Sequence, residues 1–173
     1  QLAGSEAPDL QEIRERLGAV PIPIIVPAGT GEEFEGIIDL IEPALLVFDT
    51  ESLGESFQRL PVPPERASRV EEERKRMIEE LANHVESFSD VYLGDAPISV
   101  DQIRLALREG TIARRITPVL AGSALKNVGV QPVLDAVCLY LPSPLDLPPA
   151  KGENPTTGKV EERPPRPDAP SSA

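Results

Sequence analysis

One stretch of the sequence, residues 114–137, reads RRITPVLAGSALKNVGVQPVLDAV. Its continuous apolar run at 116–120 has strand length, and the loop that follows opens with Gly122 and Ser123. Amphipathic spacing then predicts a helix over 130–141, whose inward face is expected to hold Val130, Val133, Leu134, Val137, Cys138 and Leu141. Ligands often bind at loops that follow the carboxyl ends of strands in α/β sheets. The residues alone, however, favour an ordinary strand-to-helix connection.

The chain before this stretch carries the signals of a small antiparallel sheet. Three β-rich runs are separated by turn residues, at 34–40, 44–48 and 57–62. The segment 20–27 contains three prolines, and a proline lacks the N–H that a central strand donates to its neighbours. This segment is therefore expected only as an edge strand or an extended entry.

Helical signals accompany these strands. Residues 64 to about 86 place their apolar side chains on one side of a helix, and the other side carries the predicted i,i+4 pairs Glu65–Arg69 and Glu72–Arg76. Ser99 and Gln102 form a capping-box pattern at the start of another helix, with Gly110 expected just after its end. Shorter helices are predicted at 9–17 and 88–93. The expected fold class is α+β, with an α/β-type strand–loop–helix piece.

Composition disfavours several classes of protein. A net charge of −12 over 173 residues disfavours nucleic-acid binding and suits either a basic protein partner or solubility alone. The single cysteine allows no disulfide within the chain and fits a reducing compartment, so a cytoplasmic location is expected. No apolar run approaches the roughly 20 residues that cross a membrane. Prolines gather in 143–173, which is expected to be a linker.

Catalytic and metal chemistry have little support in the sequence. It contains no G-x-x-x-x-G-K-S/T loop, so none of its segments can wrap nucleotide phosphates. His84 and Cys138 cannot supply a usual zinc set; His84 is expected to be solvated or packed, and Cys138 to be a small buried hydrophobe. Asp39 and Glu42 could be drawn as acid and base, as could the glutamates at 71–73, but mixed neighbouring charges indicate a solvated surface. No catalytic residue and no metal site are predicted.

The loop Gly122-Ser123-Ala124-Leu125-Lys126-Asn127 resembles the Ser-Ala-Leu/Lys guanine-recognition loop of translational GTPases. Its surroundings, GSALKNVGVQPVLDAVCLYLPSPLDLPP, are similar to the end of the GTPase domain of elongation factor G. Three upstream stretches resemble the same family in the same order: ERLGAVPIPIIVPAG, EEFEGIIDLIEPALLVF and YLGDAPISVDQIRLALREGTIARRITPVLAGSA. The chain is thus identified as resembling an internal fragment of bacterial-type elongation factor G, over about residues 13–151.

The resemblance implies a domain organisation and a nucleotide site. Residues 1–19 would be an N-terminal segment with the last helix before an insertion, 20–113 the G′ insertion subdomain, 114–142 the final strand and helix of the P-loop GTPase domain, and 143–173 a linker toward the next β-barrel domain. Ser123, Ala124 and Leu125 would contact guanine, chiefly through backbone N–H groups to its O6. The family's phosphate loop, switches and Asn-Lys-x-Asp motif have no counterpart here. The parent would use GTP or GDP with magnesium, whereas the fragment is expected to hold no cofactor and to hydrolyse no GTP.

The resemblance also implies partners. The long helix is similar to a docking site for the C-terminal domain of the ribosomal stalk protein, at the positions of Ser68, Glu71, Glu72 and Arg76. Expected partners are the ribosome and the remaining domains of the parent, with neither a membrane nor direct nucleic-acid contact. The expected role is that of an interaction and structural module within the GTPase that promotes ribosomal translocation. A paralogous ribosome-protection or recycling GTPase and a stand-alone acidic adaptor are the alternatives. Strand edges and an apolar face at 116–120 would permit self-association.

Overall fold

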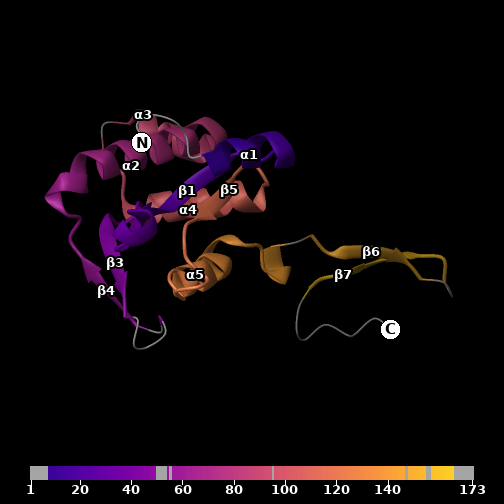
Figure 1. Cartoon of the computed structure of the whole chain (residues 1–173). Helices are drawn as coiled ribbons and strands as arrows, with labels where there is room; N and C mark the ends of the chain where they lie inside the picture. The colour runs from indigo at the N-terminus through magenta and orange to yellow at the C-terminus, as the bar shows by residue number, and fades with distance from the viewer. Residues whose placement is uncertain are drawn as a thin grey trace. The chain divides into compact units, whose positions relative to one another are not determined.

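The computed structural model describes residues 8–49, 54, 56–94, 96–146, 148–154 and 157–165. The chain divides into two compact units, Gln1–Tyr140 and Leu141–Ala173 (Figure 1). The elements of the first unit are α1 (Pro8–Leu17), β1 (Pro21–Ala28), η1 (Gly31–Glu33), β2 (Gly36–Asp39), β3 (Ala44–Phe48), β4 (Phe57–Leu60), α2 (Pro64–His84), α3 (Glu86–Leu93), α4 (Val100–Ile112), β5 (Thr117–Leu120) and α5 (Val130–Tyr140). Those of the second unit are η2 (Pro144–Asp146), β6 (Ala150–Glu153) and β7 (Val160–Arg163).

A five-stranded mixed sheet in the order β4-β3-β2-β1-β5 forms the centre of the first unit. The strands β1 to β4 pair antiparallel, as a meander of short runs separated by turns predicts. β5 pairs parallel with β1 and ends the sheet. The predicted α+β class is confirmed, and the strand of the 114–142 segment continues the sheet of the 20–113 segment.

The expectation that the proline-rich segment lies at a sheet edge is wrong, because β1 lies between β2 and β5. The register explains how the prolines are accommodated. Pro21 and Pro23 lie in the half of β1 that is paired with β5, whereas Pro27 lies in the half that is paired with β2. Each proline therefore has a neighbouring strand on one side only. A proline in an edge strand is tolerated for the same reason, because it lacks the N–H that a second neighbour would need.

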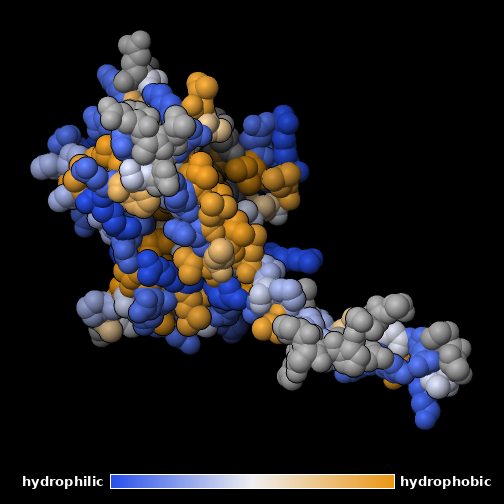
Figure 2. All heavy atoms as spheres, turned by 90° about the horizontal axis from the view of Figure 1, so that it is seen from below, coloured by the Kyte–Doolittle hydropathy of each residue, from blue (hydrophilic) through white to orange (hydrophobic). Residues whose placement is uncertain are grey.

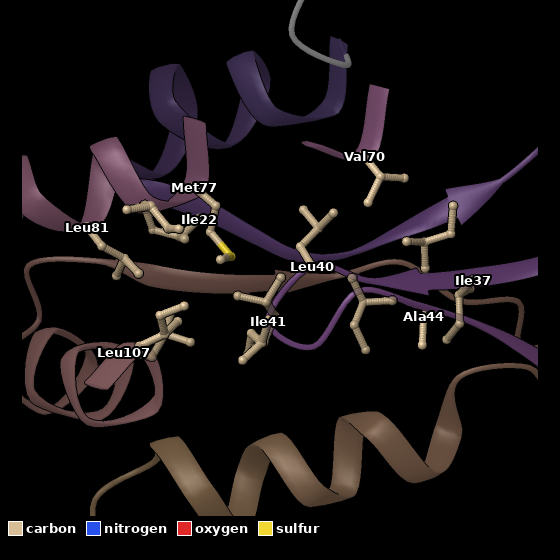
Figure 3. Close-up of a cluster of buried hydrophobic side chains, with 14 of the residues drawn as sticks. Ile22, Ile37, Leu40, Ile41, Ala44, Val70, Met77, Leu81 and Leu107 are labelled. Carbon is tan, nitrogen blue, oxygen red and sulfur yellow. The ribbon is translucent and has the colours of Figure 1, made fainter. Parts of the chain in front are cut away.

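Helix α2 covers one face of the sheet with the apolar side that its period predicts. Val70, Met77 and Leu81 are buried, and Figure 3 shows them on the side of the core that holds Ile22 of β1 and Leu40, which directly follows β2. The ion pairs on the outer side differ from those predicted. Arg69 Nε lies 2.8 Å from Glu73 Oε1, so this arginine pairs with the following turn of the helix and not with the preceding one.

Helix α4 begins with the predicted capping box. The backbone N–H of Gln102 donates to Ser99 Oγ at 3.2 Å, and that of Ser99 donates to Gln102 Oε1 at 2.8 Å. The sequence predicted that the helix ends before Gly110. In the structure it continues through Gly110 to Ile112. Gly110 is buried, and a Cβ there would lie 2.8 Å from Ile116 and Val85 side-chain atoms, so its role is close packing and not termination.

The predicted inward face of α5 is wrong. Tyr140 is the helix residue that is buried, whereas the apolar stripe faces solvent at Val130, Val133, Leu134, Val137, Cys138 and the adjoining Leu141. Figure 1 shows α5 on the lower side of this unit, and Figure 2, seen from below, shows apolar side chains gathered there. The helical period was therefore right, but the sheet meets the other side of the helix. Cys138 is exposed, contrary to its predicted burial.

The second unit, which falls in the segment expected as a linker, contains regular secondary structure. β6 and β7 form an antiparallel hairpin in which Lys151 Nζ lies 2.8 Å from Glu162 Oε1 across the strands. The amide of Asn154 donates to the Lys159 carbonyl at 2.9 Å and helps to close the turn. Throughout the described part of the chain, no helix has both the length and the apolarity to cross a membrane.

Replacing Leu81 by alanine tests the packing of α2 on the sheet. Leu81 is fully buried, so the substitution should lower the free energy of unfolding by about 2–5 kcal/mol through lost transfer energy and a cavity. The matched control is Leu93→Ala, since Leu93 is 77% exposed and should change stability by less than about 0.5 kcal/mol. Denaturant unfolding measures both variants, and equal losses would contradict the assigned core.

Candidate functional site

The loop between β5 and α5 folds back on itself as a narrow hairpin. The backbone N–H of Ser123 donates to the Val128 carbonyl and that of Val128 to the Ser123 carbonyl, both at 2.9 Å. At the tip, the Lys126 amide donates to the Ser123 carbonyl at 3.2 Å, and the Asn127 amide donates to the Ala124 carbonyl at 3.3 Å. Asn127 adopts a left-handed φ of 52°, which asparagine tolerates better than most residues. The loop therefore has a defined shape.

Two backbone donors of this loop are free. Ala124 and Leu125 are exposed, Leu125 to 94%, and their N–H groups take part in no hydrogen bond with the described residues. The N–H of Ser123 is already engaged by Val128. Of the three residues predicted to contact a base, Ala124 and Leu125 thus present backbone N–H groups that can donate to a carbonyl acceptor.

The loop lies at the open end of the sheet. It follows the carboxyl end of β5, the last strand in the order, and among the described residues no strand pairs with the far side of β5. Ser123 is half-buried, and the exposed stripe of α5 begins at Val130, directly after the loop. A ligand or a further layer of structure could therefore approach this loop.

The four candidate docking residues of α2 lie together on its outer side. Ser68, Glu71, Glu72 and Arg76 are all exposed. In the ion pairs formed within the described ranges, neither glutamate nor Arg76 takes part, whereas the neighbouring Lys75 lies 3.8 Å from Glu79. The charges of Glu71, Glu72 and Arg76 are thus available to a partner, with both signs present.

Asp39 and Glu42 lie in a cluster of ion pairs on the α5 side of the sheet. Arg59 Nη2 lies 3.0 Å from Asp39 Oδ2 and 3.1 Å from Glu42 Oε2, and Arg104 Nη2 lies 2.9 Å from Glu42 Oε1. Asp39 Oδ1 also accepts the Ile41 amide at 2.8 Å. The carboxylates are therefore engaged in joining the β2–β3 turn to β4 and α4, and this arrangement gives no reason to read them as an acid–base pair.

A cavity of about 130 Å³ lies between this cluster and α5. Its lining combines sheet residues with Arg59, Arg104, Asp135 and Tyr140. Both arginines already face carboxylates, so the cavity offers no uncompensated positive charge to an anion. None of the predicted site residues lines it, and we assign it to incomplete packing of α5 on the sheet.

Sequence reasoning missed two long-range contacts that reach the loop and its exit into α5. Lys126 Nζ lies 5.4 Å from the ring centroid of Phe34, and Gln131 Nε2 donates to the Gly54 carbonyl at 2.6 Å. No local pattern in the sequence marks either contact, because each joins residues separated by more than seventy positions.

Metal chemistry finds no further support in the geometry. His84 Nε2 lies 3.5 Å from Glu80 Oε2 on the same helix, within one turn. In the ranges that the structure describes, no three His, Cys, Asp or Glu side chains come close enough together to hold a metal ion.

Two curated relatives of this chain have the same name. No family model matches the chain. The chain is 41% identical over 165 residues to elongation factor G of Amoebophilus asiaticus (strain 5a2), which covers 95% of the chain and 23% of that protein. It is 42% identical over 163 residues to elongation factor G of Aquifex pyrophilus, covering 94% of the chain and 23% of the relative. The chain therefore spans about a quarter of the length of these relatives.

Solved structures contain the same fold. A crystal structure of a protein from Thermus thermophilus matches 88% of this chain and 24% of its own, with a TM-score of 0.66 and 24% sequence identity. At this identity the match shows that the architecture is shared.

Tyr140 gives a spectroscopic test of how α5 meets the cluster. Burial raises the pKa of its phenol above the ordinary 10.0; the charge of Arg104 opposes the rise, and Asp39 and Glu42 add to it. The folded state thus favours the neutral phenol, and this contribution to stability is present below about pH 10 and lost as pH rises through the folded pKa. In ultraviolet phenolate titration, Tyr140→Phe should remove a late-titrating phenol, whereas Tyr92→Phe should retain it. Loss of the late phase in Tyr92→Phe alone would contradict the burial of Tyr140.

Proposed function

Since the chain belongs to the elongation factor G family, as a segment with 23% of the length of its relatives, we propose that it acts in ribosomal protein synthesis as part of a translocating GTPase. In this role the Gly122–Gly129 loop closes one side of a guanine pocket whose other walls come from the rest of the parent. The segment itself is an interaction and structural module.

The observation that carries this proposal is the pair of free N–H groups of Ala124 and Leu125 at the open end of the sheet. Guanine O6 is a carbonyl acceptor, and two adjacent exposed amides suit it. The adenine N6 amino group is a donor and would meet these amides unfavourably. The loop thus has the chemistry to distinguish the two purines.

Among the described residues, none has been assigned to bind the phosphates or the magnesium ion of a GTP–magnesium complex. The parent would bind the phosphates and magnesium with other segments, which supply the charge neutralisation that phosphoryl chemistry needs. A base-edge contact alone is worth about 1–3 kcal/mol. Millimolar affinity already needs about −4 kcal/mol, so this chain alone should not bind GTP usefully.

The exposed apolar stripe of α5 supports the proposal that further structure of the parent protein packs against this helix. Val133, Leu134 and Val137 are each more than 40% exposed along one side of a helix whose other side meets the sheet. A contiguous exposed apolar surface is typical of an interface. In the proposed parent, the remaining structure of the nucleotide-binding domain covers α5 and the far side of β5.

Helix α2 is proposed as the contact for the C-terminal domain of the ribosomal stalk protein. Ser68, Glu71, Glu72 and Arg76 form an exposed group on one side of the helix. With the two glutamates free of ion pairs within the described residues, a basic partner can pair with them without first breaking contacts there. The predicted contact is weak, because charge pairs at an exposed surface contribute little each.

Thermal unfolding with added nucleotide tests whether this chain alone binds GTP or needs other segments of the parent. The melting temperature of the 173-residue chain should stay constant up to millimolar GTP with magnesium, because a ligand stabilises only when its concentration exceeds its Kd. ATP is the control for non-specific effects. A melting temperature that rises with GTP but not with ATP would show a complete site in this chain and contradict the proposal.

Amide chemical shifts test the docking of the stalk domain. Titration of the labelled chain with that domain should shift resonances of residues 68–76, and Glu72→Lys should weaken the interaction roughly threefold or more by charge reversal. The matched control is Glu12→Lys, which makes the same change in net charge at an exposed position of α1. Absence of shifts at millimolar partner, or equal weakening by both variants, would remove α2 from the proposal.

A further inference from the structure

Two loops of the 20–113 segment contact the tip of the Gly122–Gly129 loop. Phe34, between η1 and β2, places its ring below Lys126, with Nζ 5.4 Å from the centroid. Gly54, between β3 and β4, approaches Asn127 so closely that an added Cβ would lie 2.2 Å from the Asn127 carbonyl oxygen. The carbonyl of Gly54 accepts the 2.6 Å hydrogen bond from Gln131 Nε2, at the start of α5.

These contacts fall on the residues that follow the two free amides. Lys126 and Asn127 donate their own amides to Ser123 and Ala124, so a displacement of the tip moves the turn that carries Ala124 and Leu125. The residues of the tip are otherwise exposed. A turn of this size held only by its own backbone bonds would lose part of its binding energy to ordering on contact with a ligand.

We propose that Phe34 and Gly54 are positioning residues that hold the Ser123–Val128 turn in the shape required for base recognition. The proposal rests on the guanine role proposed for that turn. Phe34 supports the tip through a cation–π contact, and Gly54 supports it through close backbone packing and the bond to Gln131. The 20–113 segment thereby influences how tightly a nucleotide base is held, without touching the nucleotide.

The glycine contact allows a matched pair of variants. Gly54 has a φ of +79° and no room for a Cβ, whereas Gly31 has a φ of +58° and nothing within 4 Å of the position of a Cβ. Alanine at either position meets the strain of a left-handed backbone, but Gly54→Ala alone collides with Asn127. The difference between the two variants therefore isolates the contact with the turn from the backbone strain.

A second pair covers the case in which Gly54→Ala does not fold. Phe34→Leu keeps an apolar side chain but removes the ring below Lys126, and Phe57→Leu removes a partly exposed ring on β4. An exposed cation–π contact corresponds to a change of about two- to five-fold.

The first experiment measures amide hydrogen exchange at Ser123 and Val128 in the 173-residue chain, where their mutual hydrogen bonds report the shape of the turn. Gly54→Ala should speed exchange at both amides by roughly tenfold relative to Gly31→Ala, a change of about 1.4 kcal/mol in local opening. Phe34→Leu should speed it about two- to five-fold relative to Phe57→Leu. Equal exchange within each pair would overturn the positioning role.

The second experiment measures GDP dissociation from full-length elongation factor G in which this segment replaces its counterpart. Gly54→Ala should accelerate GDP release relative to Gly31→Ala, since positioning of the base acts on nucleotide affinity. Faster amide exchange with unchanged GDP release would refute the guanine role of the turn. Unchanged exchange would refute the proposed support from Phe34 and Gly54 while leaving the guanine role intact.

Discussion

The parallel pairing of β1 with β5 is the contact on which the rest of the structure depends. It joins strands that lie far apart in the chain, in a register that sets Pro21 opposite Thr117 and Pro23 opposite Val119. This pairing places the loop that follows β5 beside the same sheet as the antiparallel strands β1 to β4. Because this pairing uses chiefly the first half of β1, the second half remains free for β2, and one proline-rich strand serves two neighbours.

The orientation of α5 follows from the same arrangement. β5 ends the sheet, so α5 returns beneath strands whose lower side carries the Asp39, Glu42, Arg59 and Arg104 cluster. A helix that turned its valines and leucines toward these charges would bury apolar groups against ions that need polar partners. Instead Tyr140, with a polar tip, is buried near Arg104, and the apolar stripe faces outward. Within the described residues, both the apolar stripe of α5 and the outer edge of β5 thus remain uncovered.

The loop that follows β5 is contacted by two residues of the 20–113 segment. Phe34 and Gly54 approach it from turns of the antiparallel strands, and these turns reach it only because β1 and β5 share a sheet. The geometry thus links three features that are separate in the sequence: the proline-rich strand, the turns of the small sheet and the Gly-Ser-Ala loop. In the guanine role proposed for this loop, support from Phe34 and Gly54 would lower the ordering cost of base recognition.

The sequence by itself determined the local elements and the family. Period, capping and turn residues act over a few positions, so α2, the Ser99–Gln102 cap and the strands β2 to β4 could be predicted, and the Gly122–Asn127 motif identified the relatives. Only the tertiary structure decided which neighbours those elements meet. The central position of β1, the continuation of α4 through Gly110, the outward stripe of α5 and the contacts of Phe34 and Gly54 all depend on residues far away in the chain. Amphipathic spacing shows that a helix has an apolar side, but the direction in which that side points is set by long-range packing, which leaves no periodic trace in the sequence.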